Sequence, residues 1–238
     1  MIPREAHFTW PHANIADQEH DMIRLGLKSF QTLHPGWSIT VHTDHDLDQY
    51  LMSHLSPGDW ALLEHRHPVE KSDVWRLLLL YNQGGLYMDL DRWCNRSLDD
   101  LIDDSTRLVL PTCGDLDFSH DFMCTAAGNP IMLRALELNL ARRRQGHTNV
   151  YFLGPQTYMN AASQVILGEM LQPNPGRAAF DRMRDELEAL GYVRVFREHP
   201  PTLTLLFQPQ EGQQYPDHEA TKRDWYRINN IRHWTGQW

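Results

Sequence analysis

The chain alternates short apolar runs with longer stretches in which apolar residues recur every three or four positions. Short or alternating apolar runs are typical of strands and occupy residues 2–10, 37–43, 86–91, 108–111, 122–126 and 192–196. Helical spacing and end signals predict helices over 44–52, 57–65, 69–83, 155–170 and 178–190, and two more that begin at Asp17 and at Asn129–Pro130. Because strands alternate with helices, we expect a layered α/β domain.

The helix predicted over residues 69–83 combines apolar and charged residues. Its four leucines, Leu77–Leu80, cover every direction around a helical turn, which predicts burial on all sides. It also carries Asp73 and Arg76, which are spaced i, i+3 and so lie on one side. Buried charges are costly unless they are paired or used, so this pair is either a structural salt bridge or part of a binding site. Gly84–Gly85 then provides a left-handed stop.

The strand predicted over residues 86–91 ends in two carboxylates. Alternate side chains of a strand share a face, so Tyr87, Asp89 and Asp91 would point the same way. Carboxylates about 7 Å apart along a strand repel each other unless a positive group lies beside them. A bound Mg²⁺ or Mn²⁺ would satisfy these hard oxygen ligands and keep positions open for phosphate oxygens. The alternative is a solvated strand end.

The composition of the chain restricts which kinds of molecule the protein is expected to bind. The chain has 238 residues, enough for one large domain or two small ones, and 31 acidic against 22 basic residues. A net charge of −9 argues against a nucleic-acid binder, although a cation would let acidic residues hold a nucleotide. The sequence has neither a membrane span nor the apolar core of a signal peptide, so we expect a cytoplasmic location. Arg142–Arg144 is interpreted as a solvated helix end.

The charged segments resemble a known family, the D-x-D-containing sugar-binding glycosyltransferases. This family includes yeast-type initiating α-1,6-mannosyltransferases and is more distantly similar to glucosylating clostridial toxins. Its S-D-x-x-R helix, G-G turn and Y-x-D-x-D strand are matched at Ser72–Arg76, Gly84–Gly85 and Tyr87–Asp91, followed by a leucine-rich segment at Ser97–Leu101.

Both ends of the chain extend the resemblance. Ile2–Trp10 is similar to the family's first strand, I-P-K-x-I-H-x-x-W. His233–Trp238 is similar to its H-x-x-G-S-W end, except that Gln237 stands where serine is usual. Gly154–Pro155 resembles a turn placed near the acceptor side.

The resemblance implies an α/β GT-A fold: a Rossmann-like nucleotide-binding domain with a mixed central sheet and helical acceptor-side segments. It also implies metal-dependent, retaining transfer of a hexose from a UDP- or GDP-linked sugar. The acceptor would be a hydroxyl of a glycan, a glycolipid or a protein, and the cofactor would be Mn²⁺ (or Mg²⁺). Retaining glycosidases use a carboxylate nucleophile, but no residue here can be nominated for it. Front-face attack assisted by the leaving phosphate is the working hypothesis.

The resemblance also assigns roles to residues. Asp73, Arg76, Asp89 and Asp91 form the predicted catalytic set, and the metal would be bound by Asp89, Asp91 and His233. Asp73 and Arg76 would hold sugar hydroxyls, and Trp10 would stack on the nucleotide base. The predicted donor-binding set is Trp10, Asp73, Arg76, Tyr87, Asp89 and Trp238.

Two other functions are compatible with parts of this pattern. A glycoside hydrolase could use Asp89 and Asp91 as acid and base, although two carboxylates on one strand do not readily flank a glycosidic bond. A noncatalytic nucleotide-sugar-binding module would be expected to have lost a charged residue, whereas all four are present. Because motifs from both ends must meet at one site, we expect a single domain over residues 1–238.

Overall fold

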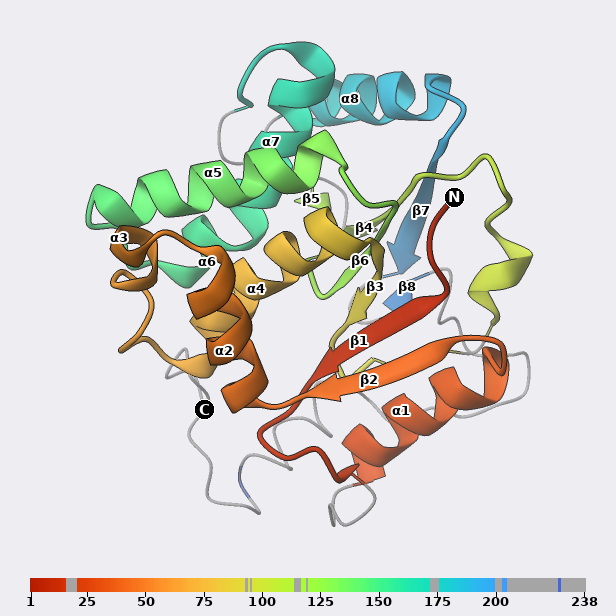
Figure 1. Cartoon of the computed structure of the whole chain (residues 1–238). Coiled ribbons are helices and arrows are strands. Elements are labelled where there is room, and N and C mark those ends of the chain that lie inside the picture. The colour runs from red at the N-terminus through yellow and green to blue at the C-terminus, as the bar shows by residue number, and fades with distance from the viewer. Residues whose placement is uncertain are drawn as a thin grey trace.

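A mixed sheet forms the centre of the computed structural model, which describes residues 1–15, 21–92, 94, 96–113, 117–118, 120–171, 176–199, 203–204 and 227. Within these residues eight strands follow the order β2-β1-β3-β6-β4-β7-β8, with β5 beside β4 (Figure 1). They are β1 (Glu5–Thr9), β2 (Ser38–His42), β3 (Gly85–Met88), β4 (Leu108–Cys113), β5 (Asp117–Phe118), β6 (Phe122–Thr125), β7 (Val193–His199) and β8 (Leu203–Thr204).

The pairing of the strands is partly parallel and partly antiparallel. Strand β1 is parallel to both β2 and β3, and β4 is parallel to β7. In contrast, β6 is antiparallel to both of its neighbours, β3 and β4. The prediction of an α/β fold with a mixed central sheet is therefore confirmed, and the extent of the domain stays a prediction.

Helices flank the sheet on both faces. The α-helices are α1 (Asp21–Leu33), α2 (Asp44–His54), α3 (Pro57–Trp60), α4 (Pro68–Gln83), α5 (Pro130–Arg144), α6 (Val150–Leu153), α7 (Pro155–Leu167) and α8 (Arg177–Ala189), and a 3₁₀ helix, η2, covers Leu98–Asp100. The start predicted at Asp17 lies outside the described residues. The helix predicted over 57–65 is too long, because beyond Trp60 the backbone bonds tighten to a turn, as from Leu63 N–H to the Trp60 carbonyl. No helix in the described part of the chain has the length and apolar character needed to cross a membrane.

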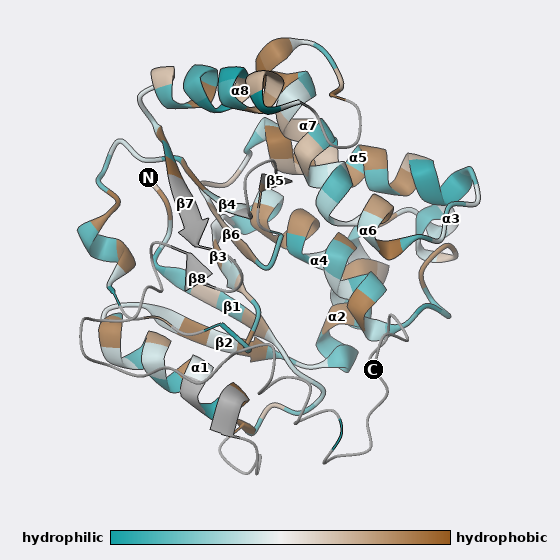
Figure 2. Cartoon of the chain, turned by 180° about the vertical axis from the view of Figure 1, so that it is seen from behind, coloured by the Kyte–Doolittle hydropathy of each residue, from teal (hydrophilic) through white to brown (hydrophobic). Residues whose placement is uncertain are grey.

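The strands bury alternate side chains in two separate cores. Leu86 and Met88 of β3 pack with Phe30 of α1, whereas Tyr87 between them belongs to the core formed with α4, α5, α7 and α8. Figure 2 shows hydrophobic positions along the central strands and a largely hydrophilic α8 at the periphery. The sheet is thus the middle layer, with α1 on one face and the larger helical layer on the other.

Helix α4 is buried along most of its length, as its leucines predict. Every residue in the range Lys71–Leu80 is buried. The helix ends at Gly84, where φ is +74°, and a Cβ there would lie 2.6 Å from the Ala127 backbone nitrogen. A Cβ on Gly85 would lie 2.5 Å from the Glu5 carbonyl oxygen. Both positions require glycine, and the turn they form leads α4 directly into β3.

Candidate functional site

The parallel strands β1 and β3 end at the same edge of the sheet, and predicted site residues follow each of them. Strands β1 and β3 pair in register, with His7 opposite Tyr87. Trp10 and Asp89 each follow directly after their strand, so both lie at the carboxyl edge, where open α/β sheets bind ligands. The Trp10 N–H donates to the His42 carbonyl at 3.0 Å, which fixes the backbone at this edge.

The segment that contains the two carboxylates is a turn. Strand β3 ends at Met88, and the Arg92 N–H donates to the Asp89 carbonyl at 3.1 Å. The strand predicted over 86–91 is therefore too long, and side-chain alternation does not place Asp91. The turn packs on α1, because a Cβ on Gly26 would lie only 2.0 Å from the Leu90 carbonyl oxygen.

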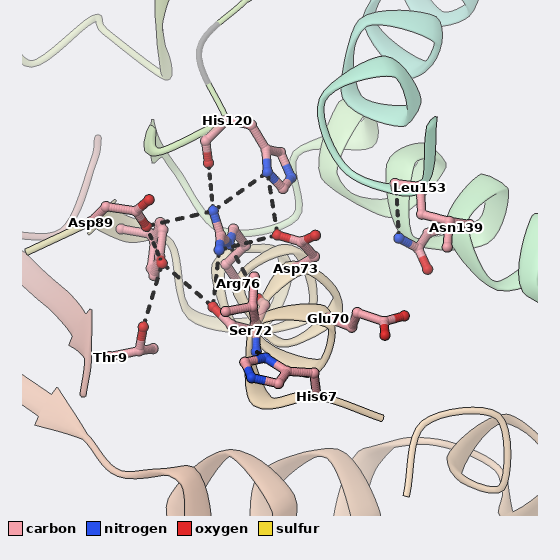
Figure 3. Close-up of polar contacts among 12 residues, drawn as sticks. Thr9, His67, Glu70, Ser72, Asp73, Arg76, Asp89, His120, Asn139 and Leu153 are labelled. Atoms are coloured by element: carbon pink, nitrogen blue, oxygen red, sulfur yellow. Dashed lines mark hydrogen bonds and ion pairs between the residues drawn. The ribbon is translucent and has the colours of Figure 1, made fainter. Parts of the chain in front are cut away.

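Arg76 connects the charged residues of α4 with the turn after β3 (Figure 3). Its Nη2 lies 3.1 Å from Asp73 Oδ1, and its Nη1 lies 3.7 Å from Asp89 Oδ1. The guanidinium also lies over the Tyr87 ring, 4.2 Å from its centroid. The Asp73 and Arg76 side chains are almost fully buried, whereas that of Asp89 is 35% exposed. The site thus combines a buried ion pair, Asp73 and Arg76, with a more accessible carboxylate, Asp89.

Tyr87 supports Asp89 from inside the sheet. Its ring is buried, and its hydroxyl donates to Asp89 Oδ1 at 2.5 Å. The same hydroxyl lies 3.4 Å from Ser72 Oγ and 3.5 Å from Thr9 Oγ1, so α4, β1 and β3 meet at this atom. In this structure Tyr87 orients a predicted metal ligand, and its predicted contact with the donor stays a prediction.

The pKa values of both carboxyl groups beside Arg76, those of Asp73 and Asp89, are raised. Burial raises the pKa of Asp73 to about 6, although the charge of Arg76 acts in the opposite direction. Burial, together with repulsion from Asp91 and Asp121, raises the pKa of Asp89 to about 6 against the opposing effect of Arg76. Repulsion among these carboxylates is of the kind that a bound cation offsets.

His120 is a residue of this site that sequence reasoning missed. Its carbonyl accepts from Arg76 Nη1 at 2.8 Å, and its ring Nδ1 lies 3.4 Å from the same nitrogen. Nδ1 also lies 3.5 Å from Asp73 Oδ1. A signal was present, because a His-Asp pair directly precedes β6, whose first residue, Phe122, pairs with Met88 at the end of β3.

Asp121 completes the connection between β6 and the turn. Its carbonyl accepts from the Asp89 N–H at 2.8 Å, and its carboxylate accepts from Arg92 Nε at 2.7 Å. The backbone on both sides of Asp89 is therefore held, through Asp121 on one side and Arg92 on the other. This fixes the position of Asp89 relative to Arg76.

The arginine run at the end of α5 is largely buried, which corrects its interpretation as a solvated helix end. Arg142 is 7% exposed. Its guanidinium donates to the Phe152 carbonyl at 2.7 Å, to Thr157 Oγ1 at 2.7 Å and to Asn160 Oδ1 at 2.5 Å. Among the three arginines, Arg144 is the exposed one. The run therefore holds the α6–α7 segment against α5.

Hydrogen bonds from α5 to its neighbours also place the turn between α6 and α7 next to the site. Asn139 donates to the Leu153 carbonyl at 2.7 Å (Figure 3). Arg143 donates to Glu70 Oε2 at 2.9 Å and thereby ties α5 to the first turn of α4. At the turn itself, a Cβ on Gly154 would lie 3.0 Å from Asp73 Oδ2. The weakly matching Gly154–Pro155 motif thus belongs to the surroundings of Asp73.

The chemistry of the predicted metal ligands is in part suited to a divalent cation. Asp89 and Asp91 supply hard oxygens and act electrostatically on one another. No group of three or more histidine, cysteine or acidic side chains in the described part of the chain is arranged to hold a metal. The third predicted ligand, His233, and the predicted donor contact Trp238 lie outside the described residues, as does Gln237.

The central part of the chain matches a known family. Residues 21–108 match the family described as the glycosyltransferase sugar-binding region containing a DXD motif. This region is similar to the DXD glycosyltransferase family. The resemblance inferred from the sequence is confirmed, and the DXD region contains Asp73, Arg76, Tyr87, Asp89 and Asp91. Trp10, His120 and Gly154 contribute to the site from outside it.

Similarity to named proteins extends beyond the DXD region. Inositol phosphoceramide mannosyltransferase 1 of Schizosaccharomyces pombe is 27% identical over 166 residues, which make up 67% of this chain and 48% of that protein. Mannosyl phosphorylinositol ceramide synthase SUR1 of Saccharomyces cerevisiae is 27% identical over 167 residues, or 70% and 41% of the two chains. The chain thus spans about half or less of the length of these curated relatives.

A solved structure shares the fold. The PaToxG glycosyltransferase superposes with a TM-score of 0.53 at 18% sequence identity, covering 97% of this chain and 84% of that chain. At this identity the similarity concerns the fold alone. The predicted GT-A fold is confirmed for the chain that carries the DXD region.

Proposed function

We propose that this protein is a metal-dependent retaining glycosyltransferase that moves a hexose from a nucleoside-diphosphate sugar to a hydroxyl acceptor. The observation that carries the proposal is the arrangement around Arg76, which lies 3.1 Å from Asp73 and 3.7 Å from Asp89. The S-D-x-x-R and D-x-D motifs therefore form one polar site at the carboxyl edge of β1 and β3.

The named relatives support a first choice of substrates. The S. pombe protein is named a mannosyltransferase acting on inositol phosphoceramide, and the S. cerevisiae protein a mannosyl phosphorylinositol ceramide synthase. We therefore propose mannose as the transferred hexose and a glycolipid with an inositol phosphate headgroup as the acceptor. A glycan or protein acceptor is the alternative for the same donor site.

The proposed cation would be held by Asp89 and Asp91, with His233 as a further ligand. When bound, a Mn²⁺ or Mg²⁺ ion would neutralise charge that develops on the leaving diphosphate. Tyr87 contributes by donating to Asp89 Oδ1, which leaves Oδ2 as that carboxylate's other oxygen for the cation.

The protein's own residues would position the donor. Asp73 is an acceptor for sugar hydroxyls, and Arg76 holds its Oδ1 in place through the 3.1 Å ion pair. Trp10 at the end of β1 offers an indole for the nucleotide base at the same sheet edge. Orientation of this kind is a large part of the rate enhancement in group transfer, because it removes the entropic cost of aligning two substrates.

The decisive experiment measures donor turnover and metal binding separately. GDP-mannose and UDP-glucose are incubated with the protein with and without Mn²⁺, and released nucleotide is quantified. Thermal unfolding is recorded with Mn²⁺ alone and with Mn²⁺ plus GDP or UDP. We expect Asp89→Asn and Asp91→Asn to lose both turnover and the metal-dependent rise in Tm. Asp104→Asn, at an exposed carboxylate, should keep both.

Two outcomes would contradict the proposal. If the Asp89 and Asp91 variants bind Mn²⁺ and release nucleotide as well as the wild type, the metal site is wrong. If no donor is turned over or bound, the transferase function is wrong. The anomeric configuration of the product, read by NMR, tests the proposed retention. Fractionation of the source cells tests the proposed cytoplasmic location.

A further inference from the structure

One buried ring nitrogen of His120 has no hydrogen-bond partner among the residues that the structure describes. The His120 side chain is 7% exposed, and its Nδ1 edge faces Arg76 and Asp73. The other ring nitrogen, Nε2, is buried and has no hydrogen-bond partner among the described residues. Because buried polar atoms are nearly always hydrogen-bonded in folded proteins, this nitrogen requires an explanation.

The neighbours of the ring define which nitrogen carries the proton. Nδ1 lies 3.4 Å from Arg76 Nη1, which can only donate, and 3.5 Å from Asp73 Oδ1, which already accepts from Arg76 Nη2 at 3.1 Å. We therefore assign Nδ1 as an acceptor for Arg76. Burial and the adjacent charge of Arg76 lower the pKa of His120 well below its usual value, so the ring is neutral. The single ring proton then lies on Nε2. This N–H is a donor that needs an acceptor.

A carboxylate oxygen of Asp73 borders the same space at Gly154 as the His120 ring. Both described contacts of Asp73 use Oδ1, which leaves Oδ2 facing the turn before α7. A Cβ on Gly154 would lie 3.0 Å from Asp73 Oδ2 and 3.4 Å from His120 Cε1. Figure 3 shows the outer ring edge of His120 and the second oxygen of Asp73 turned toward the side on which Leu153 lies. Glycine at position 154 therefore keeps a side chain out of the space next to both groups.

We propose that His120 Nε2 and Asp73 Oδ2 together bind one hydroxyl of the donor sugar, with Gly154 leaving the room for it. A hydroxyl accepts from an N–H and donates to a carboxylate at the same time, so one group satisfies both atoms. The inference rests on the proposed transferase function. It makes His120 a specificity-determining residue, because a sugar that lacks this hydroxyl, or presents it in the other configuration, leaves two buried polar atoms unpaired.

Two substitutions at His120 separate sugar binding from support of Arg76. Glutamine places its amide near the position of Nε2, whereas asparagine places its amide near Nδ1. We expect His120→Gln to keep most of the kcat/KM for the preferred donor, and His120→Asn to lose about 10- to 100-fold, the usual effect of removing a buried hydrogen bond to substrate. His65→Ala, which changes a histidine side chain that is 92% exposed, is the matched control and should be unchanged.

Deoxy donors identify the hydroxyl. The 2-, 3-, 4- and 6-deoxy analogues of the preferred donor are compared in the wild type and in His120→Asn. For one analogue the two proteins should have the same kcat/KM, because the hydroxyl that contacts His120 is already absent. Gly154→Ala, whose methyl group would occupy the same space, should raise the KM for the parent donor more than it lowers kcat.

Each result supports or overturns the inference. If His120→Asn keeps activity while His120→Gln loses it, the ring only positions Arg76 and the inference is wrong. The inference is also wrong if the loss is equal for every deoxy donor. Thermal unfolding identifies variants that fail to fold, in which case Gly154→Ala with the deoxy donors decides. A wild type that turns over no donor contradicts the proposed function itself, whereas an active wild type with unaffected His120 variants contradicts this inference alone.

Discussion

Replacing Arg76 by methionine would leave the Asp73 carboxylate without its positive partner. Methionine keeps the length of the side chain but none of its donors. The substitution removes hydrogen bonds to the Ser72 carbonyl, to Ser72 Oγ and to the His120 carbonyl, which are 3.2, 3.0 and 2.8 Å long. It also removes the ion pair with Asp73, whose side chain is only 9% exposed. We expect a loss of about 3–5 kcal/mol in the free energy of unfolding at pH 8, typical of a broken buried pair.

The size of this loss should depend on pH. Even with Arg76 present, burial raises the pKa of Asp73 from 3.8 to about 6, a difference that corresponds to about 3 kcal/mol. Because the pKa is higher in the folded than in the unfolded state, folding takes up a proton, and stability falls as pH rises from about 4 through 6. Without Arg76 the pKa of Asp73 rises further. At pH 5 the variant protein can therefore protonate Asp73 and avoid the buried charge.

The assay is urea unfolding followed by tryptophan fluorescence at pH 5 and pH 8. Arg76→Met should be closer to the wild type at pH 5 than at pH 8. The double variant Asp73→Asn/Arg76→Met should recover part of the loss at pH 8, because no charge remains to be buried. An equal loss at both pH values, together with no recovery in the double variant, would refute the electrostatic explanation and assign the loss to packing.

Two further predictions concern residues that support the site. Tyr87→Phe removes the 2.5 Å hydrogen bond to Asp89, so the Mn²⁺ concentration for half-maximal donor turnover should rise about tenfold with little change in Tm. The control is Tyr192→Phe, at a residue that is 42% exposed. An unchanged Mn²⁺ requirement in Tyr87→Phe would contradict the role given to Tyr87. Arg142→Met removes three hydrogen bonds to the α6–α7 segment and should lower the free energy of unfolding by about 2–4 kcal/mol. Arg144→Met, at a side chain that is 55% exposed, should cost less than about 1 kcal/mol, and equal losses for the two arginines would show that burial is not the cause.

Local signals in the sequence predicted much of the fold. The leucines at 77–80 indicated the buried helix α4, and Asn129–Pro130 marked the start of α5, where Asn129 does cap the helix by accepting from the Ile131 N–H. The end of β3 was not predictable in this way. Leu90 continues the alternating pattern, but its carbonyl packs on Gly26 of α1, a contact between segments far apart in the chain.

The site was predictable where its residues are close in sequence. Asp73 and Arg76 are one helical turn apart and form an ion pair, and Arg76 also lies 3.7 Å from Asp89 Oδ1. The roles of His120 and Arg142 were not predicted, because the residues that they contact are distant in sequence. A run of arginines at a helix end has the same local pattern whether it is solvated or buried, and only the α6–α7 segment packed against it makes Arg142 an internal donor.

The antiparallel register between β3 and β6 has a consequence for how the site tolerates change. Met88 pairs with Phe122, so the residues just beyond each strand, Asp89 and Asp121, are held together by the ladder and by their own backbone hydrogen bond of 2.8 Å. The residues directly after β3, Asp89–Arg92, are part of this geometry, because Arg92 contacts both Asp89 and Asp121. The chain between η2 and β4 makes none of these contacts. A change in the length of that later segment should therefore leave the distance from Asp89 to Arg76 unchanged.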